Sequence, residues 1–247
     1  MCELLSVRSV SKSFVRGEEL LPVLVDVSLE VAEGEIVAVV GSRDSGKTTL
    51  LRVAAGMARP EQGEVWFADR ELTGFSDAKR SRLFGREIAW TDREGPGVRL
   101  KVRDFAGLPL TMGRRLGRRE VRDLALEALE RVGIPGCAGQ RWEELSKWEQ
   151  VLVGLARGIV SRPRLLIIDD LLDGLGMKRT QEVGDLLGSL VAELGCGVLM
   201  GVSDLEAALV ADRVWSFTRG RLKLISDQSG TGTNASYRPP QKCPAER

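Results

Sequence analysis

Histidine is absent from the 247 residues of this chain. Its absence excludes a histidine general base, a histidine metal ligand and an imidazole proton switch near neutral pH. Cysteine is scarce, with four residues scattered along the chain, so neither a disulfide framework nor a zinc site is predicted. We expect the four cysteines to be ordinary thiols.

Long apolar runs and an excess charge of either sign are also missing. The longest uncharged apolar stretches, residues 36–41 and 165–168, are far shorter than the roughly 18 to 20 residues of a membrane helix. The N-terminus lacks a basic segment followed by an apolar run, so we expect a soluble, cytoplasmic chain. Lys and Arg total 36 against 35 Asp and Glu, so the net charge is close to zero. No overall positive electrostatic field therefore attracts the chain to nucleic acid or anionic lipid.

Strand and helix patterns alternate along most of the chain. Short β-rich runs predict strands at 5–10, 23–31, 36–40, 64–68, 165–168, 197–202 and 214–217. Helix formers at 47–56 follow a glycine-rich turn. This alternation predicts an α/β fold in which helices wrap a parallel sheet, as one domain with lobes.

The middle and the end of the chain differ from this pattern. Residues of about 93–160 are predicted to form an inserted helical lobe, in which Leu124, Leu129 and Val132 share one apolar helix face. The tail, residues 226–247, is rich in Gly, Ser, Thr and Pro and is expected to be disordered. The folded domain is therefore predicted to span residues 1–225.

Residues 41–48 fit the phosphate-loop pattern G-x-x-x-x-G-K-[ST], after an apolar strand and before a helix. Glycines let backbone N–H groups converge on phosphates, Lys47 reaches the β and γ phosphates, and the Thr48 hydroxyl ligates Mg²⁺. A chance glycine-rich turn would lack this context. The predicted nucleotide-binding residues are Gly41, Ser42, Arg43, Asp44, Ser45, Gly46, Lys47, Thr48 and Thr49.

The acidic partner of such a loop lies at the end of another buried strand. Asp169 follows the apolar run 165–168 and meets this requirement for holding Mg²⁺ through water. Taken alone, Asp169 would be interpreted as a solvated carboxylate at a strand end. Together with the loop, it predicts a site for ATP and Mg²⁺.

Further motifs follow in a fixed order. Leu145-Ser146-Lys147-Trp148-Glu149-Gln150 stands where ABC-type ATPases carry an LSGGEQ signature, and residues 204–213 and 220–222 resemble the end of that domain. Over about residues 3–225 the chain resembles an ABC (ATP-binding cassette) ATPase. Residues 85–88 and 107–110 are similar to the lipoprotein-releasing and macrolide-exporter group. The resemblance implies a P-loop NTPase core, an N-terminal antiparallel β subdomain and an inserted α-helical subdomain.

The resemblance also assigns roles to single residues. Two cassettes of this family sandwich ATP, so Ser146 would face a nucleotide bound by a partner cassette. Phe14 falls where an aromatic ring stacks on adenine, although a core phenylalanine is an equal alternative. Asp170 takes the place of the catalytic glutamate, and Ser203 that of the switch histidine.

Several positions depart from the family pattern. They are Asp44 in the phosphate loop, Asp92 or Arg93 at the Q-loop glutamine, Lys147 and Trp148 at the signature glycines, Asp170, Gly176 at the D-loop aspartate, and Ser203. These departures affect the chain's own site and the face it offers a partner. We therefore expect slow or absent hydrolysis in a heterodimer with a different, competent cassette, with Trp148 at the contact.

The resemblance further implies a membrane permease docked near residues 93–110, which would place the chain on the cytoplasmic face of the membrane. A non-transporting regulator that signals to a membrane protein is the alternative. A soluble cassette protein acting on ribosomes or DNA is disfavoured, because such proteins carry two cassettes or a long coiled-coil insert in one chain. This chain shows neither, and its charge is near neutral. No nucleic-acid partner is expected.

Overall fold

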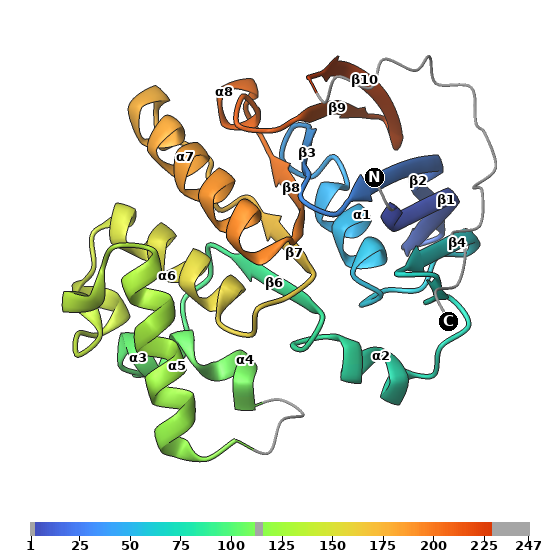
Figure 1. Ribbon diagram of the computed structural model, residues 1–247. Helices are drawn as coiled ribbons and strands as arrows, with labels where there is room; N and C mark the ends of the chain where they lie inside the picture. The colour runs from blue at the N-terminus through green and yellow to red at the C-terminus, as the bar shows by residue number, and fades with distance from the viewer. Residues whose placement is uncertain (1–2, 112–115, 229–247) are drawn as a thin grey trace, which may run out of the picture.

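Two sheets meet around helix α1 (Lys47–Ala54) in the computed structural model, which describes residues 3–111 and 116–228 (Figure 1). The antiparallel sheet has the order β2-β1-β4-β5, formed by β1 (Glu3–Arg16), β2 (Glu19–Ala32), β4 (Gln62–Phe67) and β5 (Arg70–Glu71). The other sheet has the order β10-β9-β3-β8-β7-β6, formed by β3 (Ile36–Val40), β6 (Ile88–Asp92), β7 (Leu165–Asp169), β8 (Gly197–Val202), β9 (Arg213–Thr218) and β10 (Arg221–Asp227). It is parallel except for β10. The predicted fold class is confirmed.

Period-two alternation along the parallel strands divides the interior into two cores. In β3, Val37 and Val39 pack with α1 and the antiparallel sheet, whereas Ala38 belongs to the core on the opposite face. In β7, Ile167 and Ile168 divide in the same way. Parallel strands that are apolar on both faces must be covered on both faces, which explains why helices flank this sheet.

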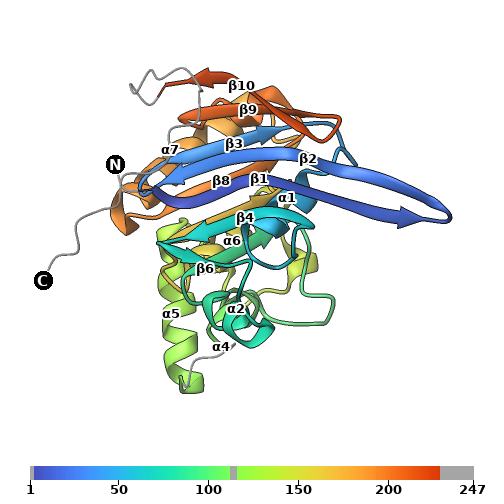
Figure 2. The same ribbon diagram turned by 90° about the vertical axis from the view of Figure 1, so that its right-hand side faces the viewer.

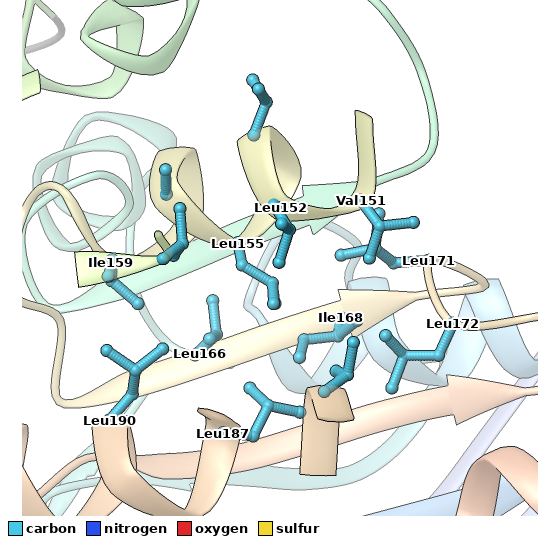
Figure 3. Packing of buried hydrophobic residues seen from close by; sticks show 14 of the residues in the cluster. Val151, Leu152, Leu155, Ile159, Leu166, Ile168, Leu171, Leu172, Leu187 and Leu190 are labelled. Carbon is cyan, nitrogen blue, oxygen red and sulfur yellow. The ribbon is translucent and has the colours of Figure 1, made fainter. Parts of the chain in front are cut away.

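Helices α6 (Lys147–Ile159) and α7 (Met177–Leu194) cover one face of β7 (Figure 3). Apolar residues of α6 recur at helical spacing, and Figure 3 shows Leu155 directed toward Leu166 of the strand. Leu187 of α7 packs into the same cluster, on the side away from α6. The strand that ends at Asp169 is thus held in place by two helices.

The predicted helical lobe is present as α3 (Val102–Ala106), α4 (Leu108–Thr111), α5 (Arg118–Arg131) and α6, grouped to one side of the sheet in Figure 1. On α5, Leu129 and the following Val132 are buried as predicted, while Leu124 is half-buried. The remaining helices are α2 (Asp77–Leu83), α8 (Leu205–Ala208) and two 3₁₀ turns, Pro135–Cys137 and Trp142–Glu144.

The last strand was not predicted. β10 pairs with β9 and continues to Asp227, two residues past the expected domain end at Ile225. Most of the predicted tail, residues 229–247, lies outside the described residues, as do Cys2 and Cys243. Cys137 and Cys196 are buried free thiols, and burial raises the pKa of Cys196 to about 11. None of the helices described is both long and apolar enough to cross a lipid bilayer.

The packing against β7 predicts unequal effects for two leucine truncations. Leu187 is fully buried and Leu209 is 61% exposed. Leu187→Ala is expected to lower the free energy of unfolding by about 2 to 5 kcal/mol, because it leaves a cavity in the core. Leu209→Ala should change it by less than about 0.5 kcal/mol. Urea denaturation of both variants measures the difference, and equal losses would contradict the described packing.

Candidate functional site

The carboxyl ends of four neighbouring parallel strands lie at one edge of the large sheet. In register, Asp92 at the end of β6 stands beside Asp169 at the end of β7, and Asp169 stands beside Gly201 of β8. The loop after β3 is tied to the same edge, because the Gly41 N–H donates to the Val202 carbonyl at 3.1 Å. Parallel pairing therefore gathers segments that lie far apart in the sequence.

The loop between β3 and α1 has little space for side chains. A Cβ on Gly41 would lie 2.8 Å from the Phe217 carbonyl oxygen, and a Cβ on Gly46 would lie 2.6 Å from Val23 Cγ1. Gly46 also has φ 106°, in the region that favours glycine. Asp44 has φ 61°, a left-handed conformation that aspartate tolerates. The loop therefore has the curled backbone that the sequence pattern predicts.

Lys47 lies inside this loop, with only 3% of the residue exposed. Its Nζ donates to the carbonyl oxygens of Gly41 at 2.7 Å and Ser42 at 3.0 Å, and to Ser203 Oγ at 3.3 Å. The Asp170 carboxylate is 3.7 Å away. An ammonium group has three donors, and three oxygens hold this one at the mouth of the loop.

Asp169 and Thr48 provide the oxygen chemistry of a hard-cation site. Asp169 is 9% exposed, and within the described part of the chain its Oδ1 has no hydrogen-bond partner. Burial raises the pKa of Asp169 and the neighbouring Asp170 carboxylate adds to this, whereas the Thr48 hydroxyl and Lys47 lower it. A buried, unpaired carboxylate oxygen close to a hydroxyl fits the ligand preference of Mg²⁺.

Asp170 and Ser203, the two residues at predicted catalytic positions, lie together beside Lys47. Ser203 Oγ is 3.5 Å from Asp170 Oδ1. Asp170 has φ 49°, and its N–H donates to the Gly201 carbonyl at 3.0 Å. The structure therefore brings the ends of β7 and β8 onto the loop lysine.

The other predicted loop residues line the outside of this cluster. Ser42, Arg43 and Asp44 are exposed. Ser45 and Thr49 are half-buried, and the Ser45 hydroxyl has no hydrogen-bond partner within the described residues. An unpaired hydroxyl buried in this loop is a polar group that a ligand could satisfy.

Phe14 lies on the long β1–β2 hairpin, which projects from the body of the molecule in Figure 2. The residue is 46% exposed, so the alternative that it is a core phenylalanine is wrong. Its ring lies 5.2 Å from Lys12 Nζ, and its cross-strand partner is Leu21. Stacking of this ring on adenine stays a prediction.

The segment 145–150 begins helix α6 rather than joining the phosphate loop. Ser146 caps the helix: its hydroxyl donates to Glu149 Oε2 at 2.7 Å and accepts from the Glu149 N–H at 3.2 Å. Lys147 is exposed, and the Trp148 ring lies 4.3 Å from the Arg179 guanidinium. Within the described residues, no hydrogen bond, ion pair or ring contact links this segment to the loop.

The backbone conformation explains why residue 176 is a glycine. It precedes α7 with φ 74° and ψ 157°, a region that is essentially restricted to glycine. The family resemblance marks position 176 only as a departure from the D-loop aspartate. The structure shows that glycine suits this backbone, in which an aspartate side chain would be strained.

Asp92 and Arg93, the two candidates for the glutamine position, have different surroundings. Asp92 accepts hydrogen bonds from Trp90 Nε1 and the Glu94 N–H and lies 3.7 Å from Arg157, so its carboxylate is already engaged. Arg93 donates to the Asp173 carbonyl oxygen, close to the strand ends. Asp92 thus lies beside Asp169 in the sheet, whereas Arg93 is hydrogen-bonded to the loop after β7, and which of the two takes the glutamine position stays a prediction.

Sequence reasoning missed Asp173. This residue is 9% exposed, and its Oδ1 accepts a hydrogen bond from the Ser203 N–H at 2.9 Å. The available signal was the spacing Asp169-Asp170-Leu-Leu-Asp173, in which a third acid follows a buried strand within four residues. Its partner lies 30 residues further along, and only the β7–β8 pairing brings the two together.

Comparisons with known proteins agree on one family. The model of the ABC transporter family matches residues 24–172. The lipoprotein-releasing system ATP-binding protein LolD of Pseudomonas fluorescens is 32% identical over 227 residues, which cover 90% of this chain and 98% of that protein. LolD of Pseudomonas syringae pv. tomato is 32% identical over 223 residues, covering 88% and 96%.

Solved structures show the same architecture. A dimeric, post-hydrolysis structure of the ATP-binding cassette MJ0796, bound to ADP and Pi, has a TM-score of 0.81 at 24% identity and covers 92% of this chain and 100% of its own. CbiO1 from Clostridium perfringens, part of the ABC transporter complex cbiONQ, has a TM-score of 0.76 at 23% identity, with 91% and 88% covered. At these identities the likeness concerns the fold.

The raised pKa of Asp169 predicts a stability effect that depends on pH. Because the folded pKa exceeds the unfolded one, ionised Asp169 destabilises the fold above the folded pKa, and the penalty disappears below the unfolded value. Asp169→Asn is expected to raise the melting temperature at pH 7 and to lose that advantage near pH 3. Scanning calorimetry with the exposed Asp185→Asn as control tests this; a lower melting temperature at pH 7 would refute it.

Proposed function

Because this chain belongs to the ABC transporter family, as an ATP-binding subunit, we propose that it is the weakly hydrolysing half of a heterodimer. In this role it binds Mg-ATP at residues 41–48 while a different cassette supplies efficient hydrolysis. The observation that carries the proposal is the placement of Asp170 and Ser203, two altered catalytic positions, against Lys47. The binding parts are intact, whereas the hydrolytic parts are changed.

The loop has the groups that hold a triphosphate. Its curled backbone and the N-terminus of α1 direct N–H groups and positive potential at one point, and Lys47 lies there with its ammonium on the loop oxygens. The half-exposed Phe14 ring presents an aromatic face to an adenine. The residues proposed to bind the nucleotide therefore all follow the family pattern, except Asp44.

Mg²⁺ is the second component of the proposed ligand. The Thr48 hydroxyl would hold it directly and the unpaired Asp169 Oδ1 would hold it through water. When bound, the ion supplies charge neutralisation between the phosphates. The carboxylate of Asp169 would orient a bound ion through water, and Lys47 would restrict where the phosphates lie.

Hydrolysis is weakened at two positions. Asp170 is one methylene shorter than glutamate, and an error of about 1 Å in positioning the attacking water costs on the order of 10²-fold. Its carboxylate also lies 3.7 Å from the Lys47 ammonium, on the side of the loop lysine. Ser203 replaces an imidazole by a neutral hydroxyl, and loss of one such stabilising group costs roughly 10² to 10³ in rate.

The face offered to a partner is altered as well. In α6, Lys147 and Trp148 replace small residues, and Ser146 is occupied with Glu149. Two copies of this chain would therefore combine altered sites with altered faces, which favours a non-identical partner with an intact catalytic set. Trp148, backed by Arg179, provides an aromatic anchor for that contact.

The rest of the proposed assembly is a membrane permease. Val98 and Leu108 are exposed apolar residues within 93–110, at 63% and 39%, and supply the docking surface. Binding there would hold this chain on the cytoplasmic face of the membrane. Cargo and direction of transport would be properties of the permease.

The ATPase rate of the purified chain tests the hydrolytic part of the proposal. We expect turnover below about 1 s⁻¹, the lower limit of typical phosphoryl transferases, with ATP binding retained. Lys47→Ala, which removes the buried ammonium, provides the background for both measurements. Turnover of the chain alone within about 1 to 100 s⁻¹ would overturn the proposal.

The partner is tested by mixing the chain with candidate cassettes in the presence of Mg-ATP and following mass by light scattering. A stable pair is expected only with a cassette that carries intact signature glycines, because these let its backbone approach the nucleotide bound here. Trp148→Ala should weaken that pair, and Trp66→Ala, a change on the separate antiparallel sheet, should not. A tight homodimer with full activity would contradict the heterodimer.

A further inference from the structure

Three loops at the edge of the large sheet are joined through Asp173. Its Oδ1 accepts the Ser203 N–H at 2.9 Å, and its backbone carbonyl accepts a hydrogen bond from Arg93. The loops after β6, β7 and β8 are therefore linked by a single, 9%-exposed residue. The carboxylate binds a neighbouring backbone group rather than a cation.

The link continues to the phosphate loop. Ser203, which Asp173 holds by its N–H, has its hydroxyl 3.3 Å from Lys47 Nζ. The segment after β7 is also joined to β8, because the Asp170 N–H donates to the Gly201 carbonyl oxygen at 3.0 Å. With both tethers present, the backbone of Ser203 has little freedom to move its hydroxyl away from the ammonium.

We infer that Asp173 is a positioning residue that sets the preference of this site for a nucleoside triphosphate over a diphosphate. The lysine of such a loop reaches the β and γ phosphates, so a hydroxyl beside its Nζ lies within reach of the terminal phosphate. A triphosphate gains a hydrogen bond from Ser203 that a diphosphate lacks. Asp173 acts through Ser203 and does not touch the nucleotide.

This inference rests on nucleotide binding at residues 41–48, which forms part of the proposed function. It does not rest on the heterodimer, because binding by the isolated chain suffices. The proposed role of Asp173 is also separate from hydrolysis, because it concerns the ratio of the affinities for ATP and ADP and not the rate of turnover.

The test measures Kd for Mg-ATP and for Mg-ADP by isothermal titration calorimetry on the full chain. Asp173→Ala is expected to raise the ratio of Kd for ATP to Kd for ADP about tenfold, as the hydrogen bond of a hydroxyl to a charged phosphate is lost. Asp173→Asn keeps an oxygen acceptor at Oδ1 and should preserve the ratio. Asp185→Ala, an exposed change in α7, is the matched control.

A double-mutant cycle separates positioning from a general loss of structure. In the Ser203→Ala background, Asp173→Ala should no longer change the ratio, because the hydroxyl that it positions is gone. Asp173→Ser, whose side chain is too short to reach the Ser203 N–H, replaces the alanine variant if that one does not fold.

Three results would overturn the inference: an unchanged ratio in Asp173→Ala, an asparagine variant as impaired as alanine, or additive effects in the cycle. Wild-type chain that binds neither nucleotide would instead refute binding at the phosphate loop, and with it the proposed function. If only the inference fails, the wild-type chain still binds ATP and the Lys47→Ala variant does not.

Discussion

The site is organised around one buried ammonium group. A lysine with 3% exposure is tolerated only if its charge is hydrogen-bonded, and Lys47 meets this condition with two carbonyl oxygens and a serine hydroxyl. Those acceptors come from the loop after β3 and the end of β8. The parallel order β3-β8-β7-β6 places these segments at the same edge, so the strand order is a precondition for satisfying the lysine.

The polar residues after β6, β7 and β8 interact with one another. Arg93 contacts Asp173, Asp173 holds Ser203, and Ser203 and Asp170 both face Lys47. These contacts give partners to polar groups that would be unfavourable if they were buried without one. The mutual contacts indicate a site whose residues are adjusted to each other.

Among the unpaired polar groups of the described site, Asp169 has the most direct ligand chemistry, because a carboxylate oxygen is a preferred ligand of Mg²⁺. Asp169 is buried by the same β7 packing that places it, its Oδ1 lacks a partner within the described residues, and burial raises its pKa. Proteins retain such destabilising groups where function needs them. The apolar packing of α6 and α7 against β7 offsets the unfavourable burial of this carboxylate.

Short-range patterns were sufficient for the fold class and for the phosphate loop. The loop is recognisable because glycines, Lys47 and Thr48 act within eight residues, and the strands are recognisable because alternation and apolar runs are local signals. β10 escaped prediction since its residues are alternately half-buried and exposed, with few large apolar groups. Its pairing with β9 supplies what its own sequence lacks.

Other features of the site depend on tertiary structure alone. Exposure of Phe14 depends on how far the β1–β2 hairpin projects, and the hydrogen bond from Arg93 to Asp173 depends on where the loops after β6 and β7 lie. The need for glycine at position 176 is a matter of backbone angles that a sequence does not show. The sequence by itself determined which chemical groups are present and which of them act as a local motif. Only the parallel pairing of distant strands determined which groups meet, because contacts across 30 to 156 residues leave no periodic signal in the chain.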